Sequence, residues 1–178
     1  LFRSSAASDV YKRQVVSDLE LDEIVDILQH LPEKRMNMIL GKMSSRDRQR
    51  IEEALIYPED SAGGLLNTDV ISVRPGHTVE VVMNYLRAQK ELPENTDKIF
   101  VVSSDDLYIG ELLITTIITS DPSLTVREIM ETNISPILAT IEDKEVATLF
   151  ERNDLISSAV VDNTNKLIGR ITIDDVVD

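Results

Sequence analysis

Acidic side chains at helical spacing are the residues of this sequence best suited to chemistry. Asp22 and Asp26 stand four residues apart, so on a helix both carboxylates project from one face. Asp175 and Asp178 are three residues apart near a predicted helix start, and Asp174 widens this second group. Like charges at such spacing cost about 0.2–0.5 kcal/mol unless something neutralises them. A solvated polar face also explains the first pair, and helix capping explains part of the second, so both interpretations stay open.

The overall composition narrows the function. The 178 residues include 18 Lys and Arg against 32 Asp and Glu, which gives a formal net charge of −14. Charge of this sign disfavours binding to nucleic acid, because a phosphate backbone is held by a surplus of Lys and Arg. The chain has no Cys, and its only histidines, His30 and His77, are far apart in the sequence. No nucleophile, base and orienting group form a recognisable set, so we expect no enzyme activity.

Three short helices are predicted over residues 15–57. Ser17 and Glu20 have the spacing of a capping box, and apolar residues then recur at helix-face intervals until Pro32. A second helix is predicted to begin near Glu33, and Ser44 or Ser45 can cap a third. This segment is too short for a comfortable core of its own. We therefore expect it to lean on neighbours or to be the end of a longer helical array.

Two segments interrupt this pattern. Residues 1–14 show no periodicity, and we interpret them as a non-native or disordered leader that stands outside the fold. Over residues 58–67, Pro58 and the pair Gly63 and Gly64 break the helical pattern and indicate a junction between domains. No apolar run in the sequence approaches the roughly 18 residues needed to span a bilayer.

After the junction the sequence repeats a strand-helix-strand-strand-helix pattern. We assign the first copy to residues 68–130 and the second, shortened at its end, to residues 131–178. Matching Gly110 with Gly169 gives an offset of 59, whereas matching Arg87 with Arg152 gives 65. The difference of six predicts an insertion around residues 91–97, before the middle strand of the first copy. One copy is too small to bury both faces of its sheet, so we expect the two to pack together.

The repeat and its surroundings resemble a known family. Residues 167–175 read Leu-Ile-Gly-Arg-Ile-Thr-Ile-Asp-Asp, an ending similar to that of paired CBS (cystathionine-beta-synthase) domains. Together with the helical segment and the junction, this ending resembles the cytosolic region of the MgtE family of magnesium transporters. The resemblance implies an α+β fold in which a small, superhelical all-helical segment precedes a tandem β-α-β-β-α CBS pair.

The resemblance also implies a set of metal ligands. In MgtE-like proteins, acids on the helical domain face acids on the CBS domains, and Mg²⁺ fills the interface. Carried over to this sequence, the candidate metal-binding residues are Asp22, Asp26, Gly64 through its carbonyl oxygen, Asp154, Asp175 and Asp178. Mg²⁺ takes oxygen ligands and keeps several waters, so scattered carboxylates without Cys or His are of the right type.

Paired CBS domains also suggest a nucleotide. The second copy keeps Gly169, Thr172 and Asp175 at the spacing with which many CBS pairs contact the ribose of an adenosyl ligand such as ATP. The first copy departs from this spacing, with Leu113 and Thr116 in the matching places after its glycine. Asp175 belongs to both sets of candidate ligands, and capping of a helix N-terminus explains it equally well.

The resulting prediction is a regulatory region rather than an enzyme. We expect Mg²⁺ to bridge the acidic faces of the helical and CBS domains and to favour the closed state of a magnesium transporter. The resemblance implies a homodimer formed through the CBS domains, a pore domain on the same polypeptide and a place at the cytoplasmic face of the cell membrane. An adenine-nucleotide-sensing CBS module of another transporter or enzyme is the alternative, and a dimerisation scaffold without ligand response is the third.

Overall fold

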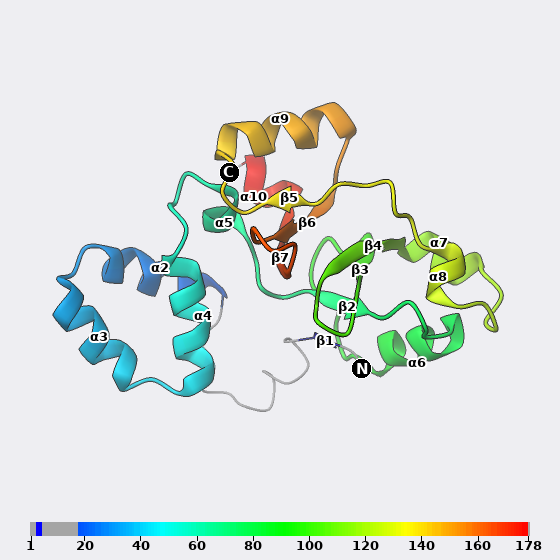
Figure 1. Cartoon of the computed structure of the whole chain (residues 1–178), viewed down its shortest axis with the longest axis horizontal. Helices are drawn as coiled ribbons and strands as arrows, with labels where there is room; N and C mark the ends of the chain where they lie inside the picture. Colours follow the sequence, from blue (N-terminus) through cyan, green and yellow to red (C-terminus); the bar gives the residue numbers. More distant parts are fainter. Residues whose placement is uncertain (1–2, 5–17, 178) are drawn as a thin grey trace.

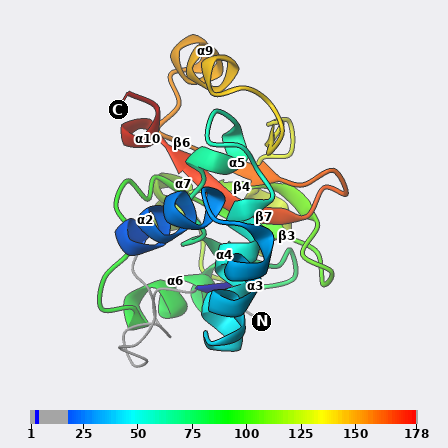
Figure 2. The same cartoon turned by 90° about the vertical axis from the view of Figure 1, so that its left-hand side faces the viewer.

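The computed structural model describes residues 3–4 and 18–177 of the chain, although not the side chains of residues 3–4, 18–22 and 53. It has a helical segment beside two small sheets, each with helices packed on it (Figure 1). The view in Figure 2 places the helical segment in front of the sheets. This is the α+β arrangement that the repeat and the helical pattern predicted.

The helical segment consists of α2 (Asp18–Gln29), α3 (Glu33–Gly41) and α4 (Ser45–Leu55). Pro32 separates the first two helices, and the hydroxyl of Ser44 caps α4 by accepting from the amide of Asp47 at 3.2 Å. Leu28, Leu40 and Ile51 are fully buried where the three helices meet. Among the side chains that the structure describes in this segment, these three form the buried core, which is small and agrees with the expectation that the segment depends on neighbours.

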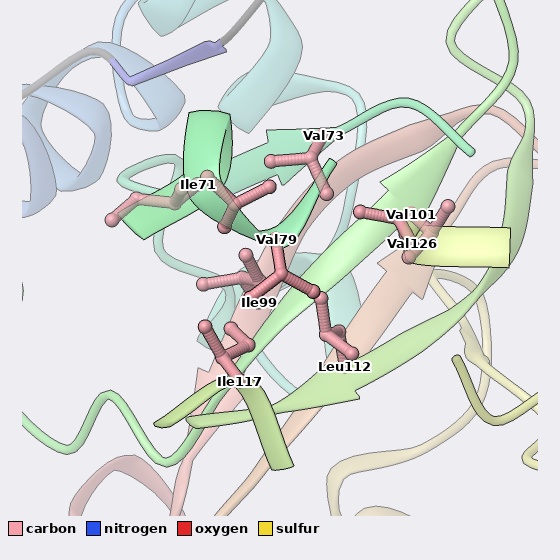
Figure 3. Close-up of a cluster of buried hydrophobic side chains, with 9 residues drawn as sticks. Ile71, Val73, Val79, Ile99, Val101, Leu112, Ile117 and Val126 are labelled. Atoms are coloured by element: carbon pink, nitrogen blue, oxygen red, sulfur yellow. The ribbon is translucent and has the colours of Figure 1, made fainter. Parts of the chain in front are cut away.

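The first repeat forms one β-α-β-β-α unit. Its elements are β2 (Ile71–Val73), α6 (Val79–Ala88), β3 (Lys98–Val102), β4 (Tyr108–Leu113) and α7 (Ile114–Thr119). β2 runs parallel to β3, and β3 pairs antiparallel with β4. Thr78 caps α6 by accepting from the amide of Val81. Val79, Ile99 and Leu112 are among the side chains of its core, which Figure 3 draws.

The second repeat has the same order and pairing. It contains β5 (Ile137–Leu138), α9 (Asp143–Asn153), β6 (Ser157–Val161), β7 (Leu167–Thr172) and α10 (Ile173–Val177), and the one-turn helix α8 (Val126–Ile129) comes before it. β5 is parallel to β6, and β6 is antiparallel to β7. A shared apolar cluster of Phe100, Tyr108, Ala159 and Leu167 joins the sheets of the two repeats. The predicted tandem packing is therefore confirmed.

The one-turn helices before each repeat are exchanged between the cores. The helix α5 (Ala62–Leu65) buries Ala62 in the core of the second repeat, whereas α8 buries Val126 in the core of the first. The segments beside these helices pair with the opposite repeat, through mutual backbone hydrogen bonds between Asn67 and Arg170 and between Glu111 and Glu131. The predicted junction therefore contains a helix and belongs to the second core, although its glycines suggested only a break.

The glycines of both repeats permit this exchange. An added Cβ at Gly110 would overlap the carbonyl oxygen of Glu131, and one at Gly169 would lie 2.6 Å from the carbonyl oxygen of Asn67. Neither glycine has a positive φ. Both positions therefore require glycine for the close approach of another backbone segment and not for an unusual conformation.

One described piece of the predicted leader takes part in a sheet. Arg3 and Ser4 form β1 (Arg3–Ser4), which pairs antiparallel with β2 opposite Ser72 and Ile71. The edge of β2 offers unpaired backbone groups, and an extended segment of any sequence can satisfy them. Arg3 and Ser4 are therefore paired with the first sheet, whereas residues 1–2 and 5–14 lie outside the described part of the chain, and the leader stays a prediction.

Candidate functional site

Asp26 contacts a second carboxylate across the boundary between the helical segment and the junction. Asp26 lies exposed on α2, and Glu59 lies exposed between α4 and α5. A side-chain hydrogen bond with Asp26, followed by charge repulsion from the same group, raises the pKa of Glu59 above its ordinary value. Once Glu59 has lost its proton, its negative charge and that of Asp26 repel each other. A cation placed between them would remove this repulsion.

Gly64, another predicted ligand, is brought close to this pair. An added Cβ at Gly64 would lie 2.8 Å from the Cα of Glu59, so the backbone of α5 passes directly beside the junction acid. Sequence analysis did not select Glu59. The only signal for it was its place in the acidic pair Glu59 and Asp60, directly after Pro58, and a pair of exposed acids in a turn is common.

A cavity of about 680 Å³ separates the helical segment from the repeats at this point. Val25 and Gln29 of α2 line it on one side, and Glu59 and Gly64 line it at the junction. The wall formed by the repeats includes Asp106, Asp162, Lys166 and Ile168. The cavity is large enough to hold hydrated ions between the two parts of the chain.

The other predicted metal ligands are not assembled with Asp26. Asp154 ends α9 in the left-handed conformation, with φ 50°, and is exposed. Asp22 lies in α2, but its side chain and the whole of Asp178 lie outside the described part of the chain. Within the described residues, no group of three or more His, Cys, Asp or Glu is arranged to hold a metal ion. The predicted multi-ligand set therefore stays a prediction. Of its members, Asp26 contacts another carboxylate, Glu59, which the prediction did not include.

The predicted nucleotide residues all have structural roles. Asp175 accepts hydrogen bonds from the amide (3.0 Å) and hydroxyl (2.9 Å) of Thr172, which is the capping arrangement at the start of α10. The hydroxyl of Thr172 also bonds Asp174. Gly169 allows the backbone of Asn67 to approach β7, as described above. These contacts explain the three residues without a ligand, and nucleotide binding by them stays a prediction.

Two buried ionic groups occupy matching positions after the repeat glycines, and sequence analysis missed both. Glu111 follows Gly110 and pairs with Lys98, Nζ to Oε1, at 3.3 Å. Burial raises the pKa of Glu111, and the charge of Lys98 opposes that shift. Arg170 follows Gly169, and burial lowers its pKa against the opposing charges of nearby carboxylates. The sequence does not show which way a charged side chain in a strand will point, so it could not identify Glu111 or Arg170 as buried groups.

Both histidines make local contacts with the backbone. His30 donates from Nδ1 to the backbone carbonyl of Asp26 at 2.7 Å, at the end of α2. The imidazole of His77 accepts from the amide of Arg74 at 3.3 Å within its own turn, and burial lowers its pKa.

The fold defines a class of protein, a helical domain followed by a paired CBS module. The family model of the MgtE intracellular N domain matches residues 5–60, and that of the CBS domain matches residues 126–178. The chain belongs to the MgtE family. The match to the MgtE intracellular N domain begins at residue 5, inside residues 1–14, which we interpreted as a leader.

Curated relatives carry the name magnesium transporter MgtE. The protein from Thermus thermophilus is 32% identical over 89% of this chain, and that from Bacillus subtilis is 25% identical over 92%. This chain spans about a third of their length, 36% in each case. These relatives are named as transporters and not as enzymes. Within the part of the chain that the structure covers, no helix is long and apolar enough to cross a membrane.

Solved structures agree in fold. A crystal structure described as the cytosolic domain of the Mg²⁺ channel MgtE in complex with ATP matches with a TM-score of 0.77 at 32% identity, over 89% of this chain and 65% of that one. The soluble part of a magnesium transporter matches with a TM-score of 0.77 at 25% identity, over 89% of this chain and 62% of that one.

Proposed function

We propose that this chain is a Mg²⁺-sensing regulatory region of a magnesium transporter. The observation that carries the proposal is the contact between Asp26 and Glu59, two carboxylates that face each other where the helical segment meets the repeats. At neutral pH this contact is repulsive without a cation. Mg²⁺ between the two would hold the helical segment against the CBS pair, and Asp22, Asp154, Asp175 and Asp178 would supply further sites. Membership of the MgtE family supports this proposal.

The magnitude of the response requires several ions. A site with free ligand at about three times its dissociation constant contributes roughly 0.8 kcal/mol. Moving a two-state equilibrium from 1:99 to 99:1 needs about 5.5 kcal/mol. One carboxylate pair therefore cannot switch the domain arrangement, and the ions must act at several places along the interface. This agrees with acids that are spread over the chain instead of gathered in one cluster.

In the whole protein, closure of these domains would favour the closed state of the pore. The pore domain would be carried by the same polypeptide, and the region described here would lie at the cytoplasmic face of the cell membrane. A second copy of the chain, packed through the CBS repeats, would complete a homodimer. Each of these statements follows from membership of the MgtE family and is part of the proposal.

The experiment is small-angle X-ray scattering of the chain during titration with Mg²⁺ to about 20 mM. A control titration with NaCl matches the ionic strength, because screening alone weakens repulsion between acids. We expect the radius of gyration to fall with Mg²⁺ beyond the NaCl control. Because one pair contributes only part of the switch, Asp26→Asn should lower the radius of gyration without Mg²⁺ by a small amount and should reduce the response to Mg²⁺. Glu23→Gln, an exposed acid on the same helix, is the matched control and should behave as the unaltered chain. Full Mg²⁺-dependent compaction in Asp26→Asn would contradict the role of this pair.

A second candidate function is adenine-nucleotide sensing by the CBS pair. It is favoured by one comparison, the matched structure at 32% identity that is described as a complex with ATP. In this chain the candidate residues are Gly169, Thr172 and Asp175. Calorimetric titration with ATP in excess EDTA separates this function from the Mg²⁺ response, because the metal is then held by the chelator.

A further inference from the structure

The loop between α6 and β3 differs most between the two repeats. Nine residues, 89–97, connect α6 to β3, whereas only three, 154–156, connect α9 to β6. The difference is the six-residue insertion that the repeat offsets predicted. We call residues 89–97 the cover loop. A surface insertion of this length costs little in loop-closure entropy, so its presence needs no compensating contact to be tolerated.

The cover loop nevertheless makes polar contacts, and they reach the second repeat. Arg170 of β7 donates from Nη1 to the carbonyl oxygen of Asn95 (3.1 Å) and from Nη2 to that of Glu94 (2.5 Å). Asn95 donates from Nδ2 to Oδ1 of Asp174 at 3.0 Å. Ser157 of β6 donates to Oδ1 of Asp97 at 2.5 Å. The loop is thus fastened to β6, β7 and α10 across the boundary between the repeats.

These contacts fall on the edge of the candidate nucleotide site. Asp174 lies between Thr172 and Asp175, and its Oδ1 accepts from both Asn95 and the hydroxyl of Thr172. Arg170 lies between Gly169 and Thr172 and is 4% exposed, although its Nε has no hydrogen-bond partner. Neutral carbonyl oxygens therefore hold a buried cation that prefers charged acceptors. A negatively charged group that entered this site could replace these neutral acceptors on Arg170 and so compensate for release of the loop.

We propose that the cover loop is an intramolecular gate over the Gly169, Thr172 and Asp175 site, and that an adenine nucleotide must displace the loop to reach it. This inference rests on the second candidate function and adds its regulation. The first repeat has no equivalent, because only three residues connect α9 to β6 and no loop of the second repeat can cover the first in the same way. The gate therefore makes the two ends of the CBS pair unequal.

The test compares two asparagines that share a left-handed backbone and that each donate one hydrogen bond from the side-chain amide. Asn95 has φ 57° and donates to Asp174, and Asn165 has φ 66° and donates from Nδ2 to the carbonyl oxygen of Tyr108, at the opposite end of β7. Glycine tolerates a positive φ, so Asn95→Gly and Asn165→Gly both remove one bond without backbone strain. Ser157→Ala removes a second contact of the loop, the hydrogen bond from Ser157 to Asp97, without altering Gly169, Thr172 or Asp175.

Binding of ATP in EDTA is measured by titration calorimetry, and amide hydrogen exchange of residues 89–97 is measured with and without ATP. We expect ATP to bind about fivefold more tightly to Asn95→Gly, about 1 kcal/mol, and similarly to Ser157→Ala, with no change in Asn165→Gly. Exchange in the loop of the unaltered chain should rise when ATP binds. If the unaltered chain binds ATP but the loop variants bind equally or more weakly, or if ATP protects the loop, the gate is refuted and nucleotide sensing stands. If no variant binds ATP, both are refuted.

Discussion

Replacing Gly110 with alanine tests whether the exchanged segments hold the CBS pair together. A Cβ there would overlap the carbonyl oxygen of Glu131 and lie 3.2 Å from its carbonyl carbon. The segment must move away from β4, which weakens the two backbone hydrogen bonds between Glu111 and Glu131, at 2.9 and 2.8 Å. Forced displacement in a packed region costs about 1–3 kcal/mol and each weakened bond about 1 kcal/mol, so we expect a loss of about 3 kcal/mol.

Urea denaturation followed by circular dichroism measures this loss. With a slope of about 2 kcal/mol per molar, the midpoint should fall by about 1.5 M. Gly76→Ala is the matched control, because an added Cβ at Gly76 meets nothing within 4 Å and its φ is not positive. That change should leave the midpoint unaltered or raise it slightly, since alanine restricts the unfolded chain. Equal midpoints for the two variants would refute the argument that close approach fixes the glycine.

Two other predictions concern the helical segment and its acids. Ile51→Ala should lower the free energy of unfolding of the helical segment by about 3 kcal/mol, because Ile51 is 0% exposed and packs with the buried Leu28 and Leu40. Hydrogen exchange should then rise in residues 18–55 before it rises in the repeats. A uniform loss of protection would contradict a separate helical unit. Asp26→Asn should return the raised pKa of Glu59 toward its ordinary value of 4.5, as read from an NMR titration of the Glu59 carboxyl. Because the pKa of Glu59 is raised in the folded chain, the protonated contact with Asp26 stabilises the fold at acidic pH, and this contribution is lost as the pH rises through that raised pKa. An unchanged pKa of Glu59 in Asp26→Asn would exclude Asp26 as the cause of the shift.

Local signals in the sequence predicted most of the elements. The Ser44 side chain caps α4, as its position before an apolar helical pattern suggested. The repeat offsets located the insertion before β3, because an offset between matched residues depends only on chain length. Such features are decided within a few residues of the chain, and local sequence records them directly.

Long-range partners could not be read in this way. The pattern at Ser61, Ala62 and Gly63 indicates a break, but it does not say which core receives the turn. Ala62 enters the second core because the carbonyl oxygens of Ile141 and Ala139 accept from the amides of Ala62 and Gly63, at 2.8 Å each. Glu59 was missed for the same reason, because the helices α3 and α4 separate it from its partner Asp26 along the chain.

The exchange of α5 limits how the helical segment can move. Because α5 is built into the second core, the connection after α4 is confined to residues 56–60. This connection is itself held, since Tyr57 packs against the second core and the carbonyl oxygen of Asp60 accepts from the amide of Asp143 at 2.8 Å. Gly63 packs so closely on the ring of Tyr57 that an added Cβ would overlap it. Glu59 lies inside this short connection, so a force between Asp26 and Glu59 acts directly between the helical segment and the second core.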